Sequence, residues 1–245
     1  MNRNFAGLAL ICGLALMPSA VLAQPAPTPP ASAAPPMTVL TQSSEYRFQL
    51  DFHVGDAALA KLLPAGWVSN AATQGAAKDA NIRLIFIDAS NIVGPDNRVL
   101  GKGKDLLVYI AAPVKSADGG ATGQMILGGI SQNNADAAFG VMDKASDAKV
   151  TRTVSAASGV DLVSEDWDIT AANNAHATLH VEYISAPANK SATAVNFYNP
   201  ANPAMLQIFR TEQATDVARN VTTNPPDRVR GIFLFRERRQ VRHFV

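Results

Sequence analysis

The chain has 245 residues with 21 basic and 20 acidic side chains, so its formal net charge is only +1. A balance this close to neutral gives no field that would attract nucleic acid, and we expect no nucleic-acid partner. The single cysteine, Cys12, lies near the N-terminus, which excludes disulfides, thiolate nucleophiles and zinc–cysteine sites from the rest of the chain.

Residues 1–23 have the pattern of a secretory signal peptide. Arg3 gives the start of the chain a positive charge, residues 5–17 form an apolar run, and Ala23 closes a stretch of the kind that signal peptidase cuts. The apolar run is shorter than the about 20 residues of a membrane-spanning helix. We therefore expect cleavage before Gln24, no membrane span after cleavage, and a periplasmic or secreted protein.

Residues 24–36 (QPAPTPPASAAPP) consist almost entirely of proline, alanine and serine. This composition cannot bury apolar surface and favours extended, solvated chain, so it predicts a linker. The remaining residues, 37–245, contain no second low-complexity break, and we expect them to form one domain. The sequence leaves the oligomeric state open, and a homo-oligomer is compatible with it.

Alternation of apolar and polar residues with a period of two predicts half-buried strands along most of this domain. In residues 46–54, Tyr46 and Phe48 point to one side, and Asp56 then opens a short helix that ends at Pro64. Further strand patterns cover residues 82–89, 106–114, 124–130, 150–154, 159–169, 176–185, 193–198, 205–212 and 230–236. About ten strands with a few short helices predict a mainly β (α+β) fold, as a single antiparallel β-barrel or sandwich.

Motifs that identify the common enzyme classes are absent from the sequence. It contains no nucleophile elbow, Walker loop, dinucleotide-binding fingerprint or HExxH. The common hydrolase, nucleotide-binding and zincin interpretations are therefore excluded, and we expect no cofactor. Any site must be assembled by the fold from residues that lie far apart in the chain.

The densest local polar cluster is His176, His180 and Glu182, which a period of two places on one face of a predicted strand. The two histidines would stand about 13 Å apart on an extended strand, too far to share a metal ion. We therefore predict no metal site. The cluster is typical of a solvated polar face, with His180 and Glu182 as an alternative acid/base pair.

Acidic residues also surround Trp167 in the segment SEDWDI, with Glu165 two positions before it. Two interpretations remain open. The acids lie at exposed strand ends, or one of them enters a cavity and acts on a ligand there.

Arginines are concentrated near the C-terminus, at Arg228, Arg230, Arg236, Arg238, Arg239 and Arg242. They alternate with apolar residues such as Ile232 and Leu234, which is typical of an exposed face of terminal strands. The alternative is a surface for an anionic ligand or partner.

Residues 46–67 (YRFQLDFHVGDAALAKLLPAGW) and 139–150 (FGVMDKASDAKV) together resemble two segments of the acetoacetate decarboxylase family. The first is similar to that family's opening strand and following helix, and the second to its glycine, proline, lysine, lysine segment. The resemblance covers about half of the chain beyond the predicted signal peptide, and it implies a cone-like barrel with a mostly apolar cavity for a small organic molecule.

In that family the first lysine of the pair forms a Schiff base with a keto acid, helped by the neighbouring cation. The aligned pair here is Asp143-Lys144, and Met142 stands in place of the family's proline. An acid beside the amine favours the ammonium form. The arginine expected at the start of the opening strand falls on Glu45, with Arg47 close by.

The resemblance and the clusters above give one set of candidate residues. The candidate catalytic residues are Lys144, Asp143, Glu165 and Arg47, and the candidate ligand-binding residues are Phe139, Trp167, His180 and Glu182.

Three functions remain open. The first is an exported, cofactor-independent enzyme with carbon–carbon lyase or related proton-transfer chemistry on a small organic compound. The second is a non-catalytic periplasmic protein that binds an apolar small ligand, and the third is an interaction module that uses its arginine-rich strands. An enzyme should bring Lys144 within hydrogen-bonding reach of Glu165 or Asp168.

Overall fold

The computed structural model describes residues 40–133, 141–157, 159–219 and 227–238. The expected signal peptide, residues 1–23, and the expected linker, residues 24–36, lie outside these ranges. No helix within them has the length and apolar composition needed to cross a membrane.

The described residues form one short helix and eleven strands. The helix is α1, Asp56–Ala60. The strands are β1 Gln42–Phe52, β2 Trp67–Ser69, β3 Ile82–Val93, β4 Lys104–Ser116, β5 Thr122–Ser131, β6 Met142–Ala157, β7 Val160–Ala171, β8 Ala175–Ile184, β9 Asn189–Asn199, β10 Asn202–Thr215 and β11 Val229–Arg238. The expected mainly β fold is confirmed.

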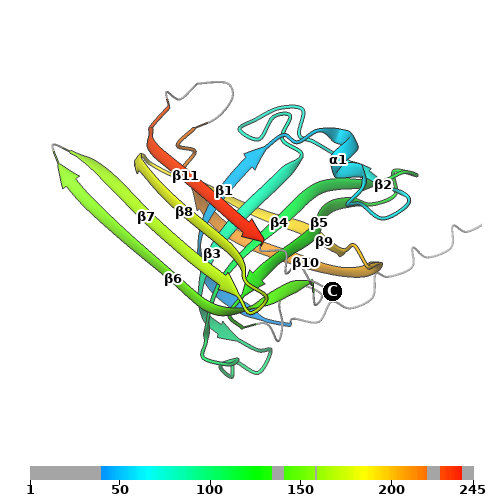
Figure 1. Ribbon diagram of the computed structural model, residues 1–245, viewed down its shortest axis with the longest axis horizontal. Coiled ribbons are helices and arrows are strands. Elements are labelled where there is room, and N and C mark those ends of the chain that lie inside the picture. Colours follow the sequence, from blue (N-terminus) through cyan, green and yellow to red (C-terminus); the bar gives the residue numbers. More distant parts are fainter. Residues whose placement is uncertain (1–39, 134–140, 158, 220–226, 239–245) are drawn as a thin grey trace, which may run out of the picture. The chain divides into compact units, whose positions relative to one another are not determined.

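The strands share one sheet in the order β1-β3-β4-β5-β6-β7-β8-β11, with β9 beside β5, β10 beside β9 and β2 beside β4. Most neighbours are antiparallel, but β5 pairs in parallel with β6 and, further along, with β9. These two short parallel pairings were not expected from the sequence. They form because two strands from later in the chain, β6 and β9, lie beside β5 (Figure 1).

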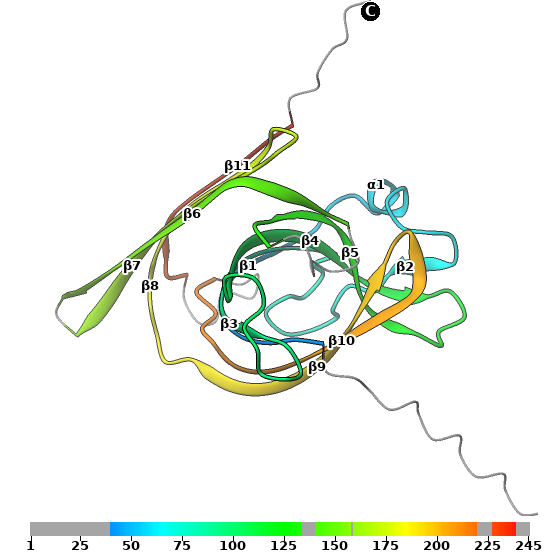
Figure 2. The same ribbon diagram turned by 90° about the horizontal axis from the view of Figure 1, so that it is seen from below.

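The sheet curls back on itself, and the β6–β7 hairpin and β11 lie outside the curl (Figure 2). One face of β3 and β4, which we call the outer face, carries Phe86 and Val108. It packs against β7 and β8 in a core that includes Trp167 and Leu179. The Phe86 and Trp167 rings lie 5.6 Å apart, so aromatic packing joins the two parts of the sheet.

The opposite face, which we call the inner face, has a core of its own. It includes Ile85 and Ile87 of β3, Tyr109 of β4 and Phe197 of β9. Because both faces of β3 and β4 are covered, the central parts of these strands are mostly apolar, as the sequence pattern indicated.

A third core closes the end of the sheet near α1. Leu59 of the helix is buried with Val114 of β4 and Met125 of β5. The helix is shorter than the sequence predicted, and Trp67 begins the short strand β2 soon afterwards.

Candidate functional site

Polar residues of β1 and β3 lie on the inner face among apolar neighbours. Because β1 alternates, Arg47 and Asp51 face away from Tyr46, which packs in the outer core. The pairing of β1 with β3 sets Arg47 opposite Ile87 and Asp51 opposite Arg83. We call this group the inner polar row; its members are Glu45, Arg47, Gln49, Asp51 and Arg83.

Hydrogen bonds and ion pairs order the inner polar row. Arg47 donates from Nε to Glu45 Oε2 at 2.6 Å, and its Nη2 contacts the same oxygen. Gln49 donates from Nε2 to both carboxylate oxygens of Asp51, at 3.0 and 2.9 Å. The charged side chains keep only 17% to 27% of their surface exposed, so they have lost most of their hydration but remain reachable.

Arg83 is the least satisfied member of the row. Its Nε lies 3.4 Å from Asp51 Oδ1, but this nitrogen is enclosed and has no hydrogen-bond partner. Its guanidinium makes no hydrogen bond to any residue within the described ranges. A buried donor without a partner costs roughly 1–3 kcal/mol, so such a group needs an explanation.

Aromatic and aliphatic side chains form the rest of the inner face. Burial raises the pKa of Tyr109 to about 12, while the nearby Arg47 lowers it and Glu45 raises it by smaller amounts, so its phenol stays neutral at physiological pH. Phe197 packs edge-on against Tyr109 at 6.4 Å and against Phe209 at 4.9 Å. The inner face therefore offers a mostly apolar surface with charges along one side.

A second polar group, the Glu165 cluster, lies on the outer side of β1; its members are Tyr46, Arg152, Glu165, Trp167 and Tyr183. Glu165 has no exposed surface. Its Oε1 accepts hydrogen bonds from the Tyr46 and Tyr183 hydroxyls at 2.5 and 2.9 Å, and its Oε2 accepts one from Trp167 Nε1 at 3.0 Å. The cluster thus ties β1, β7 and β8 together.

Charge in the Glu165 cluster is balanced by Arg152. The Arg152 guanidinium lies 3.3 Å above the Tyr46 ring, and its Nε is 3.7 Å from Glu165 Oε1. Burial and the nearby carboxylate raise the pKa of Tyr46, and burial together with the Tyr46 hydroxyl raises that of Tyr183. Both phenols therefore remain donors. This enclosed carboxylate accepts three hydrogen bonds, so we interpret its role as structural: it stabilises the packing of β1, β7 and β8.

The structure brings some of the predicted residues together and separates others. Glu165 and Trp167 meet in the Glu165 cluster, whereas Arg47 lies in the inner polar row on the other side of β1. Lys144 is exposed near the start of β6, eight positions before Arg152, which pairs with Glu165. That separation is about 26 Å along an extended strand, so Lys144 does not meet Glu165.

The two other predicted residues near Lys144, Asp143 and Phe139, do not form an enclosed site with it in the described part of the chain. Asp143 is half-buried beside it, opposite Ile130 of β5. Phe139 lies outside the described residues.

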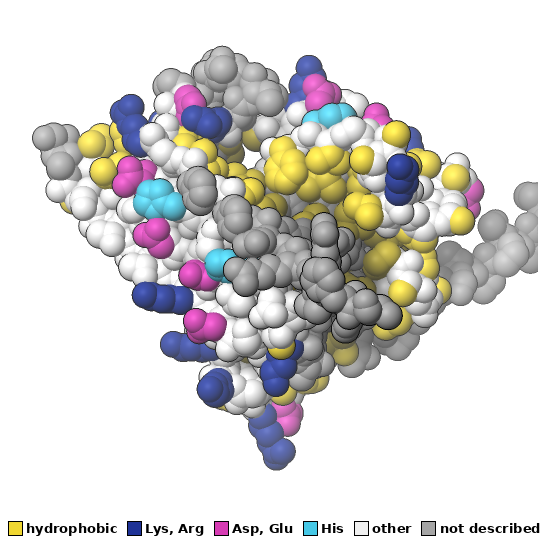
Figure 3. Space-filling view, viewed as in Figure 1, with side chains coloured by type: hydrophobic (Ala, Val, Ile, Leu, Met, Phe, Trp, Pro, Cys, Tyr) yellow, Lys and Arg dark blue, Asp and Glu magenta, His cyan; other side chains and the backbone are white. Residues whose placement is uncertain are grey.

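His180 and Glu182 lie on the exposed side of β7 and β8, away from both polar groups. His180 Nδ1 is 2.7 Å from Asp166 Oδ1, and His176 Nε2 is 2.8 Å from Asp168 Oδ1. Figure 3 shows histidine side chains at the surface of the molecule beside acidic side chains. This is the solvated polar face that the sequence indicated, and no metal-binding group occurs in the part of the chain described here.

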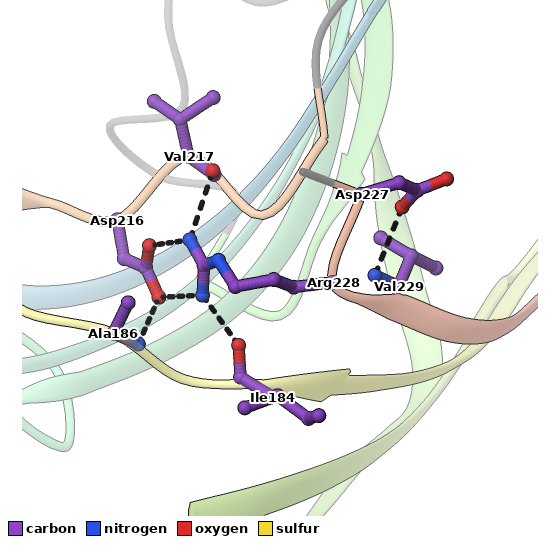
Figure 4. A network of polar contacts seen from close by, with 7 residues as sticks. All are labelled: Ile184, Ala186, Asp216, Val217, Asp227, Arg228 and Val229. Atoms are coloured by element: carbon purple, nitrogen blue, oxygen red, sulfur yellow. Dashed lines mark hydrogen bonds and ion pairs between the residues drawn. The ribbon is translucent and has the colours of Figure 1, made fainter. Parts of the chain in front are cut away.

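Arg228, in the described part of the C-terminal arginine cluster, turns into the protein. Its guanidinium binds the Asp216 carboxylate and the backbone oxygens of Ile184 and Val217 (Figure 4). Asp216 also accepts the backbone N–H of Ala186 at 2.9 Å. The sequence left an exposed strand face and a surface for an anionic ligand or partner open for these arginines; Arg228 instead pairs within the chain, whereas Arg230 is exposed.

Sequence reasoning missed Arg83, Asp51, Arg152 and the two tyrosines of the Glu165 cluster. One signal was present for Arg83, because a lone cation inside the apolar run IRLIFI is unusual unless it has a function or a partner. Asp51 and Arg152 carry no such signal, because their roles depend on which strands pair.

Comparison by sequence gives no relative for this chain. No protein-family model matches it. No curated protein matches it either.

Comparison by structure gives weak matches to three structures of the enduracididine biosynthesis enzyme MppR. The structure with the condensation product of pyruvate and imidazole 4-carboxaldehyde has a TM-score of 0.43 and 11% identity, covering 74% of this chain and 71% of that one. The structure with HEPES buffer bound has a TM-score of 0.42 and 10% identity, and the match covers 80% of this chain and 88% of that one. The structure with pyruvate has a TM-score of 0.42 and 9% identity, and the match covers 84% of this chain and 88% of that one. The resemblance to the acetoacetate decarboxylase-like fold is therefore weak and concerns the fold alone.

Proposed function

We propose that this protein binds a small organic acid on the inner face of its curled sheet, with Arg83 as the main contact for the carboxylate and Arg47 as a neighbouring cation. The observation that carries the proposal is the state of Arg83. Its half-buried guanidinium lies on an apolar face and makes no hydrogen bond to the described residues. A carboxylate would satisfy these donors, because guanidinium and carboxylate groups pair through parallel hydrogen bonds.

The charges of the row indicate the charge of the ligand. Arg47 and Arg83 are balanced by Glu45 and Asp51, so the row is neutral when empty. A singly charged ligand leaves one excess negative charge, whereas a dianion leaves two in a partly desolvated place, at a much higher cost. The apolar walls around the row favour an organic monoanion over an inorganic one.

The test is titration of the protein with butyrate, pyruvate and inorganic phosphate, followed by calorimetry or NMR. We expect both organic acids to bind more tightly than phosphate. Arg83→Met should weaken their binding by about tenfold or more, because a hydrogen-bonded charge contributes roughly 1.5–3 kcal/mol. Arg98→Met is the matched control, since Arg98 is exposed and, among the described residues, its side chain pairs only with exposed Asp96. Absence of binding to the unmodified protein would contradict the proposal.

We also propose that the protein acts outside the cytoplasm, on the strength of the signal-peptide pattern in residues 1–23. Expression of the full chain in a bacterial host should yield a periplasmic product whose N-terminal residue is Gln24. A cytoplasmic product that retains Met1 would count against export.

Lysine-dependent lyase chemistry is the second candidate. It is favoured by the exposure of Lys144, whose amine has no hydrogen bond or ion pair in the described part of the chain and is open to a keto acid. The protein should be incubated with simple β-keto acids and borohydride and then analysed by intact mass. An adduct that is lost in Lys144→Ala would support imine chemistry, and its absence would leave the inner face as a binding site.

A further inference from the structure

A glutamine with an unpaired carbonyl lies on the same inner face. Gln124 of β5 pairs with Pro113 of β4 and with Phe197 of β9. Residues paired in this way share a face of the sheet, so the Gln124 side chain lies on the face that carries Phe197. Ile126, two positions later, belongs to the inner core.

The environment of Gln124 gives its amide no partner. The residue is only 9% exposed, and its Oε1 is enclosed without a hydrogen bond. No hydrogen bond joins its amide to the residues that the structure describes. An aliphatic side chain would satisfy these apolar surroundings, whereas an unpaired buried amide is destabilising. A donor that arrives with a ligand would remove this penalty.

Gln124 and Arg83 are close enough to hold the same small molecule. Arg83 pairs with Ala111 and Gln124 with Pro113, two positions further along β4. Arg83 and Gln124 are separated by two strand spacings across the sheet and by two residues along the strands, so their Cα atoms lie about 12 Å apart. Both side chains are long and extend from the same face, so the gap between their polar ends suits a ligand of a few carbon atoms.

We propose that Gln124 makes this site selective for hydroxy acids, that is, for a monocarboxylate with a hydroxyl group that donates to Gln124 Oε1. The inference rests on the proposed function, because Arg83 must hold the carboxylate for the hydroxyl to reach Gln124. A hydroxyl is favoured over an ammonium group because a second charge is far more costly to place in apolar surroundings. Rotation of the amide about its terminal side-chain bond turns Oε1 toward the ligand.

The experiment compares matched acids. Lactate and 3-hydroxybutyrate are titrated against propionate and butyrate, with alanine as the ammonium-bearing probe, on the unmodified protein and on Gln124→Met. We expect the unmodified protein to bind each hydroxy acid roughly tenfold more tightly than its unsubstituted partner, the effect of one hydrogen bond that satisfies a buried group. Alanine should bind more weakly than lactate.

Gln124→Met should remove the preference, so that each hydroxy acid binds no more tightly than its unsubstituted partner. Its thermal unfolding temperature should equal or exceed that of the unmodified protein, because an unpaired amide has been removed. Gln124→Leu provides a second variant if the methionine variant does not fold.

The outcomes separate the two proposals. Equal binding of hydroxy and unsubstituted acids by the unmodified protein, or a preference that survives in the variant, overturns the role of Gln124 and leaves acid binding intact. Failure of every acid to bind the unmodified protein overturns the proposed function itself. Tighter binding of alanine than of lactate replaces the hydroxyl by an ammonium group and overturns the assignment to hydroxy acids.

Discussion

Glu165 and Asp166 are neighbours in β7, yet one is fully enclosed and the other lies on the surface beside His180. Both are carboxylates, so their difference comes from the alternation of the strand and not from their chemistry. Sequence reasoning could have found this, since Trp167 is large and apolar and Glu165 lies two positions away on the same face. It could not find Tyr46 and Tyr183 as partners, because only the pairing of distant strands brings them to Glu165.

Glu165→Gln should destabilise the protein by about 3 kcal/mol, because the half-buried Arg152 loses its counter-charge and the amide offers one acceptor oxygen where the carboxylate offers two. The free energy of unfolding in urea measures this. Asp166→Asn is the matched control and should change it by less than about 1 kcal/mol. Replacing Glu165 by leucine together with Arg152→Met should cost less stability than the sum of the two single replacements, because both charges are removed at once. A loss equal to that sum would contradict the coupling.

At the scale of elements, the period-two pattern located most strands, because burial of alternate residues is a local property that the sequence records. The two parallel contacts of β5 were not predictable. They depend on β6 and β9, which arrive from later in the chain, and nothing near residues 124–131 records them. The same limit applies to the inner polar row, since Asp51 and Arg83 meet only through the register of β1 with β3.

The contacts of Arg228 hold the end of β8, the chain after β10 and the start of β11 together. Asp216→Ala removes the carboxylate that pairs with Arg228 and accepts from Ala186, leaving a mostly buried guanidinium with less compensation. We expect a loss of about 2 kcal/mol in the free energy of unfolding, with faster amide hydrogen exchange in β8 and β11 than in β3 and β4.

The control for this change is Asp227→Ala. Asp227 pairs with Arg219 close by in the chain, but both side chains are about half exposed. Exposed pairs contribute little, so this variant should lose less than about 1 kcal/mol. Equal effects of the two variants would show that burial of the Arg228 pair adds no stability.

At the scale of the whole molecule, three tyrosines in two cores should make stability depend on alkaline pH. The pKa of Tyr109 is raised to about 12 and those of Tyr46 and Tyr183 are raised as well. Between the unfolded pKa near 10 and the folded values, the native state holds protons that the unfolded chain has lost. The contribution of these tyrosines to stability should therefore be constant below about pH 9 and fall as pH rises through 10 to 12.

For Tyr109 the loss amounts to roughly 2–3 kcal/mol. Urea midpoints between pH 8 and 12, with tyrosinate absorbance at 295 nm, measure it, and Tyr109→Phe should flatten the curve. A curve of the same slope in the phenylalanine variant would assign the alkaline transition to other groups.

The two faces of β1 give the molecule an optical signal of its own. Arg47, in the inner polar row, and Tyr46, in the Glu165 cluster, are adjacent residues of β1, so a shift of this strand on ligand binding would move both. Tyr46 shares the Glu165 carboxylate with the indole of Trp167. The chain has only two tryptophans, so replacing Trp67 by phenylalanine leaves Trp167 as the single tryptophan, and we expect its emission to change when the proposed ligand binds on the other face of β1.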